Sequence, residues 1–348
     1  MGSEFGKPEL LGIKEQLKDG EIYPYQFYNT LMEPVDFELF NLKHNLNFNP
    51  GIAPNMNINV YDIEVTEADL VNKFPDPGVA EYPVDTIVIY NNFTNTAYCL
   101  IRLLPSHLRK FKSTRDGMET IINKHVRKRY DGIVKDNVGY KMDGVKFVTE
   151  CFDDDYGLVK RFWELNKELE PLILMGFNSI GFDDVYMYNR SKQLYAKGLG
   201  SIMSKYKEFQ VYGKDQFSVS DYTLVDILKL YRPPDSGGFG YGESQLSYKL
   251  DYLATHHLGI QKLDLDGGFY ENYSNNLLDF TLYNVLDVIL TYKLSAQLSF
   301  MELLRGMASD ACTFEVMATG KSRAFKQEEL TEGTDVYRSY LFNKEIQK

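Results

Sequence analysis

The chain has 348 residues, 44% of them hydrophobic, and a formal net charge of −11. The length predicts one large domain with attachments or two domains, and the sequence shows neither an apolar stretch long enough for a membrane span nor a secretory signal. The acidic balance argues mildly against a nucleic-acid-binding protein, but it is compatible with an enzyme that holds metal ions with clustered acids.

The first half of the chain predicts paired strands. Residues 1–5 (MGSEF) resemble a cloning scar, and residues 6–56 show no sustained period. Segments rich in β-branched and aromatic residues follow, and we expect four strands, over 57–65, 84–92, 96–104 and 145–152. The two middle strands form a hairpin around the turn NFTN.

The second half alternates between helical and extended patterns. Helical spacing predicts helices over 153–169, 182–198 (ending at Gly198), 244–259 and 275–304. Between them we expect a buried strand at 171–178, a hairpin within 200–220, a strand or short helix at 223–231 and a loop at 232–244. The predicted fold class is α/β, with a mixed central sheet flanked by helices.

Two basic runs, HLRKFKSTR (107–115) and HVRKR (125–129), interrupt the acidic chain. Such runs are more often solvated faces than binding sites, and we interpret them so. The three cysteines (Cys99, Cys151 and Cys312) are scattered, which suits a reducing compartment and argues against a structural zinc site.

The stretch VYDIEV places two acids on one buried strand. Asp62 and Glu64 are two residues apart, so they point to the same face. Two buried carboxylates repel each other and lose hydration, so a cation must neutralise them. The alternative for this pair alone is a feature of an edge strand.

Two later segments also place acids in apolar surroundings. In FNSIGFDDVYMYNR (177–190), a strand turns into a helix that begins near Asp183; alone, Asp183 would be a helix N-cap. In YNVLDV (283–288), Tyr283 and Asp287 share one helix face, and a lone arginine or lysine could neutralise Asp287. Together the four carboxylates suit Mg²⁺ or Mn²⁺.

These three segments, in this order, resemble the exonuclease motifs of B-family DNA polymerases, most closely those of T-even-type bacteriophages. The first is VYDIEV, the second fits Asn-x-x-x-Phe-Asp with a trailing Tyr-x-x-Asn-Arg, and the third fits Tyr-x-x-x-Asp. The resemblance covers roughly residues 57–310. It implies a ribonuclease-H-like fold with a β-hairpin insertion and a DEDDy site that removes nucleotides from DNA 3′ ends.

The resemblance also implies roles for single residues. Two metal ions (Mg²⁺ or Mn²⁺) would be held by Asp62, Glu64, Asp183 and Asp287, with Asp62 bridging, and no other cofactor is expected. Tyr283 would position the attacking water. Contacts with DNA are expected from Asn178, Phe182, Tyr186, Lys205 and Lys207, although Phe182 and Tyr186 are more often core residues and the two lysines an exposed face. Asp226 matches a further acid of the family with a less certain role.

The polymerase motifs of the family are missing from this chain. We therefore expect residues 6–56 to be a partial N-terminal polymerase segment, 57–310 the exonuclease domain, and 311–348 a connection toward a polymerase domain encoded elsewhere. Either an excised piece of a longer polymerase or the N-terminal product of a split gene fits these features.

The predicted function is a metal-dependent 3′→5′ proofreading exonuclease acting on single-stranded or frayed DNA ends. Its expected partners are the DNA 3′ end, a polymerase domain or subunit and a sliding clamp, with no membrane. Its expected location is the cytoplasm, which is that of the host cell if the protein is viral. Two alternatives stay open: a non-catalytic docking or DNA-guiding subunit of a split polymerase, and a stand-alone exonuclease in repair or RNA trimming.

Overall fold

The computed structural model describes residues 57–66, 74–205, 209–212, 216–219, 221–238, 240 and 242–300. The predicted N-terminal segments (1–5 and 6–56), the predicted connection (311–348) and Lys207 lie outside the described residues. The three segments that carry the acidic motifs (60–65, 177–190 and 283–288) all lie within the described residues.

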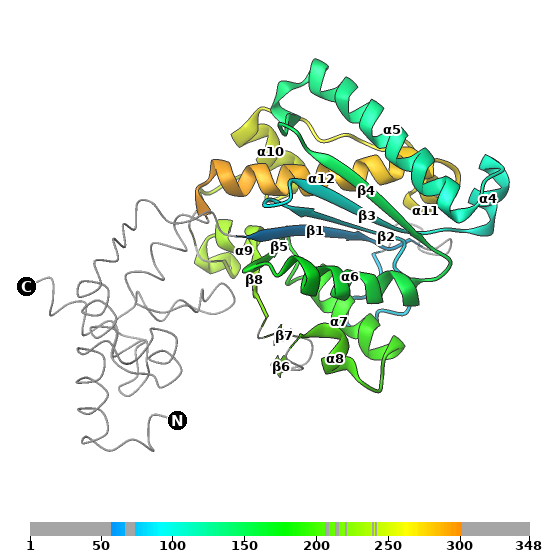
Figure 1. Ribbon diagram of the computed structural model, residues 1–348. Coiled ribbons are helices and arrows are strands. Elements are labelled where there is room, and N and C mark those ends of the chain that lie inside the picture. Colours follow the sequence, from blue (N-terminus) through cyan, green and yellow to red (C-terminus); the bar gives the residue numbers. More distant parts are fainter. Residues whose placement is uncertain are drawn as a thin grey trace, which may run out of the picture. The chain divides into compact units, whose positions relative to one another are not determined.

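The centre of the fold is a six-stranded sheet (Figure 1). Its strands are β1 (Ile58–Glu64), β2 (Thr86–Asn91), β3 (Thr96–Arg102), β4 (Lys146–Phe152), β5 (Ile173–Gly176) and β8 (Thr223–Asp226), in the order β4-β3-β2-β1-β5-β8. β2 runs antiparallel to β1 and β3, and the other neighbouring strands pair parallel. The mixed sheet confirms the predicted fold class.

Helices cover both faces of this sheet (Figure 1). On one face, α12 (Leu277–Gln297) crosses β1, β2 and β3 and packs against α5 (Arg115–Asp136), α10 (Leu250–Leu258) and α11 (Phe269–Asn275). On the other face lie α6 (Asp155–Leu169), α7 (Asp183–Leu194) and α8 (Leu199–Met203). The remaining elements are α4 (Pro105–Phe111), α9 (Ile227–Tyr231), two short 3₁₀ turns (Val138–Tyr140 and Pro234–Ser236) and the hairpin of β6 (Phe209–Tyr212) and β7 (Gln216–Val219).

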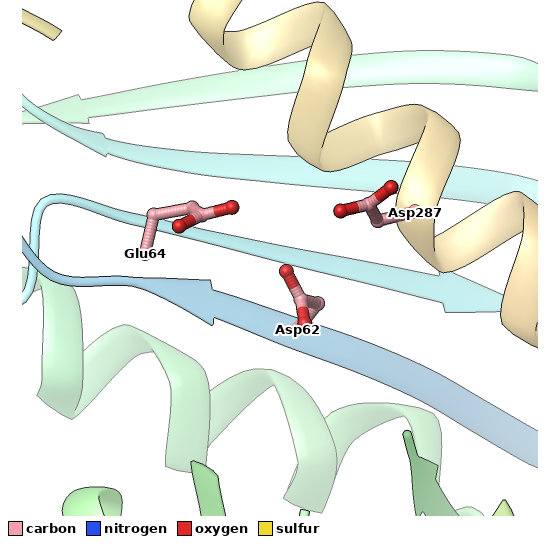
Figure 2. A group of neighbouring side chains, drawn as sticks. All are labelled: Asp62, Glu64 and Asp287. Carbon is pink, nitrogen blue, oxygen red and sulfur yellow. The ribbon is translucent and has the colours of Figure 1, made fainter. Parts of the chain in front are cut away.

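The two faces of β1 differ in chemistry. Tyr61 and Ile63 point into the apolar core under α6, where the Tyr61 ring lies 5.2 Å from that of Phe162. Asp62 and Glu64, at the alternate positions, point toward α12 (Figure 2). One strand therefore links the hydrophobic core to an acidic site.

Most predicted strands are confirmed, but several helix boundaries differ. The helix predicted to end at Gly198 ends at Leu194, and Gly198 instead precedes α8 with φ 94°. The helix predicted from residue 244 begins at Leu250. The segment 223–231 was predicted as a strand or a short helix, and it contains both: the strand β8 ends at Asp226 and the helix α9 follows. The Asp226 side chain accepts hydrogen bonds from the N–H groups of Leu228 and Lys229 and so caps α9.

Four helices have no counterpart in the sequence-based prediction: α4, α5, α8 and α11. In the 22-residue α5 the buried side chains are Met118, Ile122, Val126 and Tyr130, one per turn, so its apolar stripe is narrow. The basic run 125–129 lies on this helix, where Arg129 Nε lies 3.7 Å from an Asp279 carboxylate oxygen. The Arg129 side chain is 55% exposed, which fits the interpretation of a solvated face for this run. In the run 107–115, His107 is instead buried.

No helix among the described residues is both long and apolar enough to cross a bilayer.

Candidate metal centre

Three carboxylates from two elements converge on one space (Figure 2). Asp62 and Glu64 reach it from β1, and Asp287 reaches it from α12. One oxygen of each lies within 4.8 Å of one oxygen of the others. Since α12 crosses β1 at this point, the strand alternation that exposes the two acids also aims them at the third.

Asp287 has a partner that the sequence did not predict. The ammonium of Lys262 lies 2.7 Å from Asp287 Oδ2 and 4.4 Å from the centroid of the Tyr283 ring. The other carboxylate oxygen, Oδ1, is buried and has no hydrogen-bond partner among the described residues. The sequence left open that a lysine pairs with Asp287, and Lys262 does so. It contacts only Oδ2 and leaves Oδ1 without a hydrogen-bond donor among the described residues.

Asp62 is held by a neighbour of Tyr283. Asn284 Nδ2 donates to Asp62 Oδ2 at 2.6 Å. This amide fixes the direction of the carboxylate but brings no charge. Asn284 precedes Asp287 by three positions, so the two share one face of α12, the face that packs on β1 and its Asp62.

Burial and mutual repulsion make these acids reluctant to ionise. Burial, and then the charge of Asp287, raise the pKa of Asp62 to about 8, against the opposing effect of Lys262. Burial raises the pKa of Asp287 to about 6, and Lys262 limits the increase. Burial, followed by repulsion from Asp62, holds the pKa of Glu64 well above its usual range.

Among the described residues, three carboxylates therefore face one ammonium group, and one buried oxygen has no partner. A divalent cation would supply the missing positive charge, and carboxylate oxygens are the ligands that Mg²⁺ and Mn²⁺ prefer. The donor set and the unused Asp287 oxygen fit a metal ion.

Asp183 lies on the other side of β1 from α12. Its Oδ1 accepts a hydrogen bond from the Ile63 N–H at 3.1 Å, on the edge of β1 that β5 no longer covers. It is the first residue of α7, whose N-cap is Phe182, so the N-cap alternative does not describe it. Burial, and then the charge of Asp62, raise its pKa, yet it is outside the group of three.

Asp226 organises the turn between β5 and α7. Besides capping α9, it accepts hydrogen bonds from Asn178 N (2.9 Å) and Ile180 N (3.2 Å). Asn178 has a φ of 61°, in the left-handed region, which asparagine tolerates better than most residues. The structure thus gives Asp226 a positioning role and leaves the Asn178 side chain exposed.

Tyr186 and Arg190, at the end of the second motif, make structural contacts within the fold. Tyr186 is fully buried, and its hydroxyl donates to the Tyr82 carbonyl at 2.7 Å. The Arg190 Nε lies 2.6 Å from Asp155 Oδ2, which ties α7 to α6. A buried ring cannot stack on a base, so the expectation that Tyr186 contacts DNA is corrected: it is a core residue.

The remaining DNA-contact candidates lie near the surface. Phe182 is half-buried and lies 5.5 Å from the Tyr186 ring, between centroids. Lys205 is exposed and forms an ion pair with Glu170. Neither contact excludes a role with DNA.

Sequence reasoning missed Lys262 and Asn284. The helical spacing around Tyr283 would have revealed Asn284. Lys262 lies in the irregular segment between α10 and α11, so only the tertiary structure brings it to the acids.

Comparisons with known proteins agree with the motifs. Residues 35–229 match the family model described as DNA polymerase family B, exonuclease domain. The chain is 24% identical over 310 residues to the DNA-directed DNA polymerase of Escherichia phage RB69, covering 86% of this chain and 32% of that protein. It is 25% identical over 255 residues to that of Enterobacteria phage T4 (71% and 26%), and 26% identical over 234 residues to DNA polymerase 1 of Sulfolobus acidocaldarius (67% and 22%).

The chain spans about a third or less of the length of these curated relatives. The family model covers more than half of the chain and includes β1 with its two acids and the turn into α7. This chain belongs to the exonuclease-domain family of the family B DNA polymerases.

Proposed function

We propose that the chain is a 3′→5′ exodeoxyribonuclease that hydrolyses the terminal phosphodiester of single-stranded or frayed DNA ends. The observation that supports this most is the convergence of Asp62, Glu64 and Asp287 on one space with too little positive charge to neutralise them. A structural acid cluster would be expected to find its counter-charges within the fold.

In this proposal Asp62, Glu64, Asp183 and Asp287 hold two ions, Mg²⁺ or Mn²⁺. Bound there, the ions activate a water molecule and stabilise the leaving 3′ oxygen of an in-line displacement. Asp183 belongs to α7 and Asp287 to α12, so the proposed ligand set depends on the positions of both helices.

The protein's own groups orient the reaction. Tyr283 is largely buried, and its burial next to Asp287 and Glu64 raises the pKa of the phenol well above its usual range. The hydroxyl therefore stays protonated and is suited to hold the attacking water. Lys262 fixes the Tyr283 ring and Asp287 together, and Asn284 sets the direction of Asp62.

The substrate end must be single-stranded so that its last phosphate can reach the acids. The exposed Asn178 and the half-buried Phe182, on the turn before α7, are proposed to contact the terminal nucleotides. The hairpin of β6 and β7 is proposed to separate the strands, with Lys205 and Lys207 near phosphates.

The relatives named above are DNA polymerases, which supports a proofreading role beside a polymerase domain or subunit, together with a sliding clamp, in the cytoplasm of a host cell. We propose 57–310 as the exonuclease domain, with 6–56 and 311–348 as parts of its attachment to the polymerase.

The test is digestion of a labelled primer with a mismatched 3′ end, in Mg²⁺ and again with a chelator. We expect stepwise loss of 3′ nucleotides that the chelator abolishes, and a drop of roughly 10³-fold for Asp62→Ala, since the site supplies several kcal/mol of transition-state stabilisation. The matched control is Asn92→Ala, at the opposite end of β1.

Full activity of Asp62→Ala, or digestion in chelator, would contradict the proposal. Absence of both activity and metal binding in calorimetry would favour a docking or DNA-guiding subunit instead. Comparable rates on DNA and RNA ends would favour a stand-alone trimming enzyme, because the 2′-hydroxyl is the difference that a site could sense.

A further inference from the structure

Helix α11 packs on α12 through two aromatic residues one turn apart, Phe269 and Tyr273. Their rings lie 6.3 Å and 5.7 Å from that of Phe280, between centroids. Tyr273 is fully buried, whereas Phe269 is 45% exposed. The same helix face therefore leaves one large ring open to solvent at the end where α11 begins.

That open ring is next to the candidate metal centre. The Phe269 and Tyr283 centroids are 5.9 Å apart and the ring planes are nearly perpendicular, at 83°. Tyr283 in turn lies under the Lys262 ammonium that pairs with Asp287. Phe269 thus contacts Tyr283, which is one of the groups proposed to act at the terminal phosphate.

The backbone before Phe269 leaves room on this side. Gly268 is the N-cap of α11, and a Cβ built there would meet no atom within 4 Å. Gly267 has a φ of 88°, which sets the turn into the helix. A Cβ on Gly267 would lie 3.2 Å from Glu271 Oε2, so it is past Gly268 that a flat group can approach the Phe269 ring.

We propose that Phe269 is the platform on which a base at the 3′ end of the substrate stacks. This inference rests on the proposed nuclease function and adds a substrate contact that the motifs do not contain. Stacking tolerates every base, because each has a π face, so it suits an enzyme that removes nucleotides irrespective of sequence.

Charge makes such a platform useful here. The chain has a net charge of −11, and the acid cluster repels the phosphates of the substrate. A neutral ring binds the base without needing positive charge, so it can hold the end of the strand beside the acid cluster. The alternative is a structural role, in which Phe269 only packs against Tyr283 and keeps its ring in position.

The experiment compares Phe269→Leu with the wild-type chain. Leucine keeps an apolar contact with Tyr283 but removes the flat ring. The control is Phe93→Leu: Phe93 is 57% exposed and lies in the turn between β2 and β3, at the opposite end of β1 from Glu64. The substrates are single-stranded DNA with an ordinary 3′ end, with an abasic terminal nucleotide, or with an abasic penultimate nucleotide.

On the ordinary end we expect Phe269→Leu to raise KM about 5- to 150-fold, which corresponds to the loss of one stacked base, with kcat little changed. On one of the two abasic substrates wild type and variant should have the same KM, and that substrate identifies the base that stacks. The effect should be the same at low and high salt, because no ion is released when a neutral ring binds.

An equal loss on all three substrates, or a loss in kcat alone, would show a packing role and overturn the inference. So would an unchanged KM. If circular dichroism shows that Phe269→Leu is misfolded, Phe269→Trp takes its place: it keeps a ring, and its KM on the ordinary end should equal or fall below that of wild type. Failure of the wild-type chain to digest any substrate would instead contradict the proposed function.

Discussion

The buried Asp85, just before β2, and the half-buried Asp62 and Glu64 of β1 are surrounded by different groups. Asp85, which is fully buried, accepts hydrogen bonds from Thr66 N (2.7 Å) and Thr66 Oγ1 (2.6 Å) and from two nitrogens of the Arg102 guanidinium. Four donors and one full positive charge surround one carboxylate. This acid is matched within the protein.

The acids of the candidate metal centre are not matched. Asn284 donates to Asp62, Lys262 pairs with Asp287, and one Asp287 oxygen is buried without a partner among the described residues. Burial raises the pKa of both Asp85 and Asp62, but to about 6 for the first and about 8 for the second. The comparison indicates that four donors keep the Asp85 carboxyl ionised at neutral pH, whereas the single amide donor at Asp62 leaves the pKa of that carboxyl above neutrality.

The largest expected effect is an opposite response to the same substitution. Asp85→Asn places an amide among four donors and leaves Arg102 without its counter-charge, so we expect a loss of about 3–5 kcal/mol in the free energy of unfolding. Asp62→Asn removes repulsion from Asp287 and still accepts a hydrogen bond from Asn284, so in chelator it should unfold at the same denaturant concentration as wild type or a higher one.

Chemical denaturation at pH 7.5 in the presence of a chelator measures both variants. A large destabilisation by Asp62→Asn would show that this acid is structural and would remove the distinction between the two groups.

Tyr283→Phe tests the proposed role of the Tyr283 hydroxyl in holding the attacking water. Removing the hydroxyl leaves the ring contacts with Lys262 and Phe269 in place. We expect kcat for digestion of single-stranded DNA to fall roughly 10²-fold, at the lower end for loss of a positioned catalytic group, with KM nearly unchanged. A purely structural role for the hydroxyl predicts instead a lower unfolding midpoint and unchanged kcat.

Metal ions should sharpen the contrast. Mn²⁺ at a hundred times its dissociation constant should stabilise wild type by about 2.7 kcal/mol, because it binds the folded state alone. The gain should disappear in Asp287→Ala, which removes one of the three converging carboxylates, and persist in Thr66→Val. Thermal unfolding with and without Mn²⁺ checks this, and equal stabilisation of Asp287→Ala would place the ion elsewhere.

The smallest effect is expected at a single donor. Thr66 is buried, and Thr66→Val keeps its shape while removing the hydroxyl that donates to Asp85. Loss of one hydrogen bond to a charged group predicts a decrease of about 1.5–3 kcal/mol in the free energy of unfolding. Thr66→Ser keeps the donor and is the matched control, with a decrease smaller than that of valine.

The sequence itself determined the strands and the direction of their acids. Alternation along residues 57–65 is a local property, so it predicted both the buried strand and the common face of Asp62 and Glu64. The fourfold spacing of Tyr283 and Asp287 predicted their shared helix face in the same way. The hairpin 84–104 and the mixed sheet also followed from local composition and turn chemistry.

Only the tertiary structure decided which groups meet. Helix α5 was not predicted, because it has only one buried apolar residue per turn. The reason for this narrow stripe is clear only from its packing against β4 and α12. Lys262 reaches Asp287, and Phe269 reaches Tyr283, through irregular or short segments whose periodicity says nothing about direction. Local patterns fix which way a side chain points from its own element, but distances between elements depend on how the helices pack on the sheet, and that information lies in no single segment.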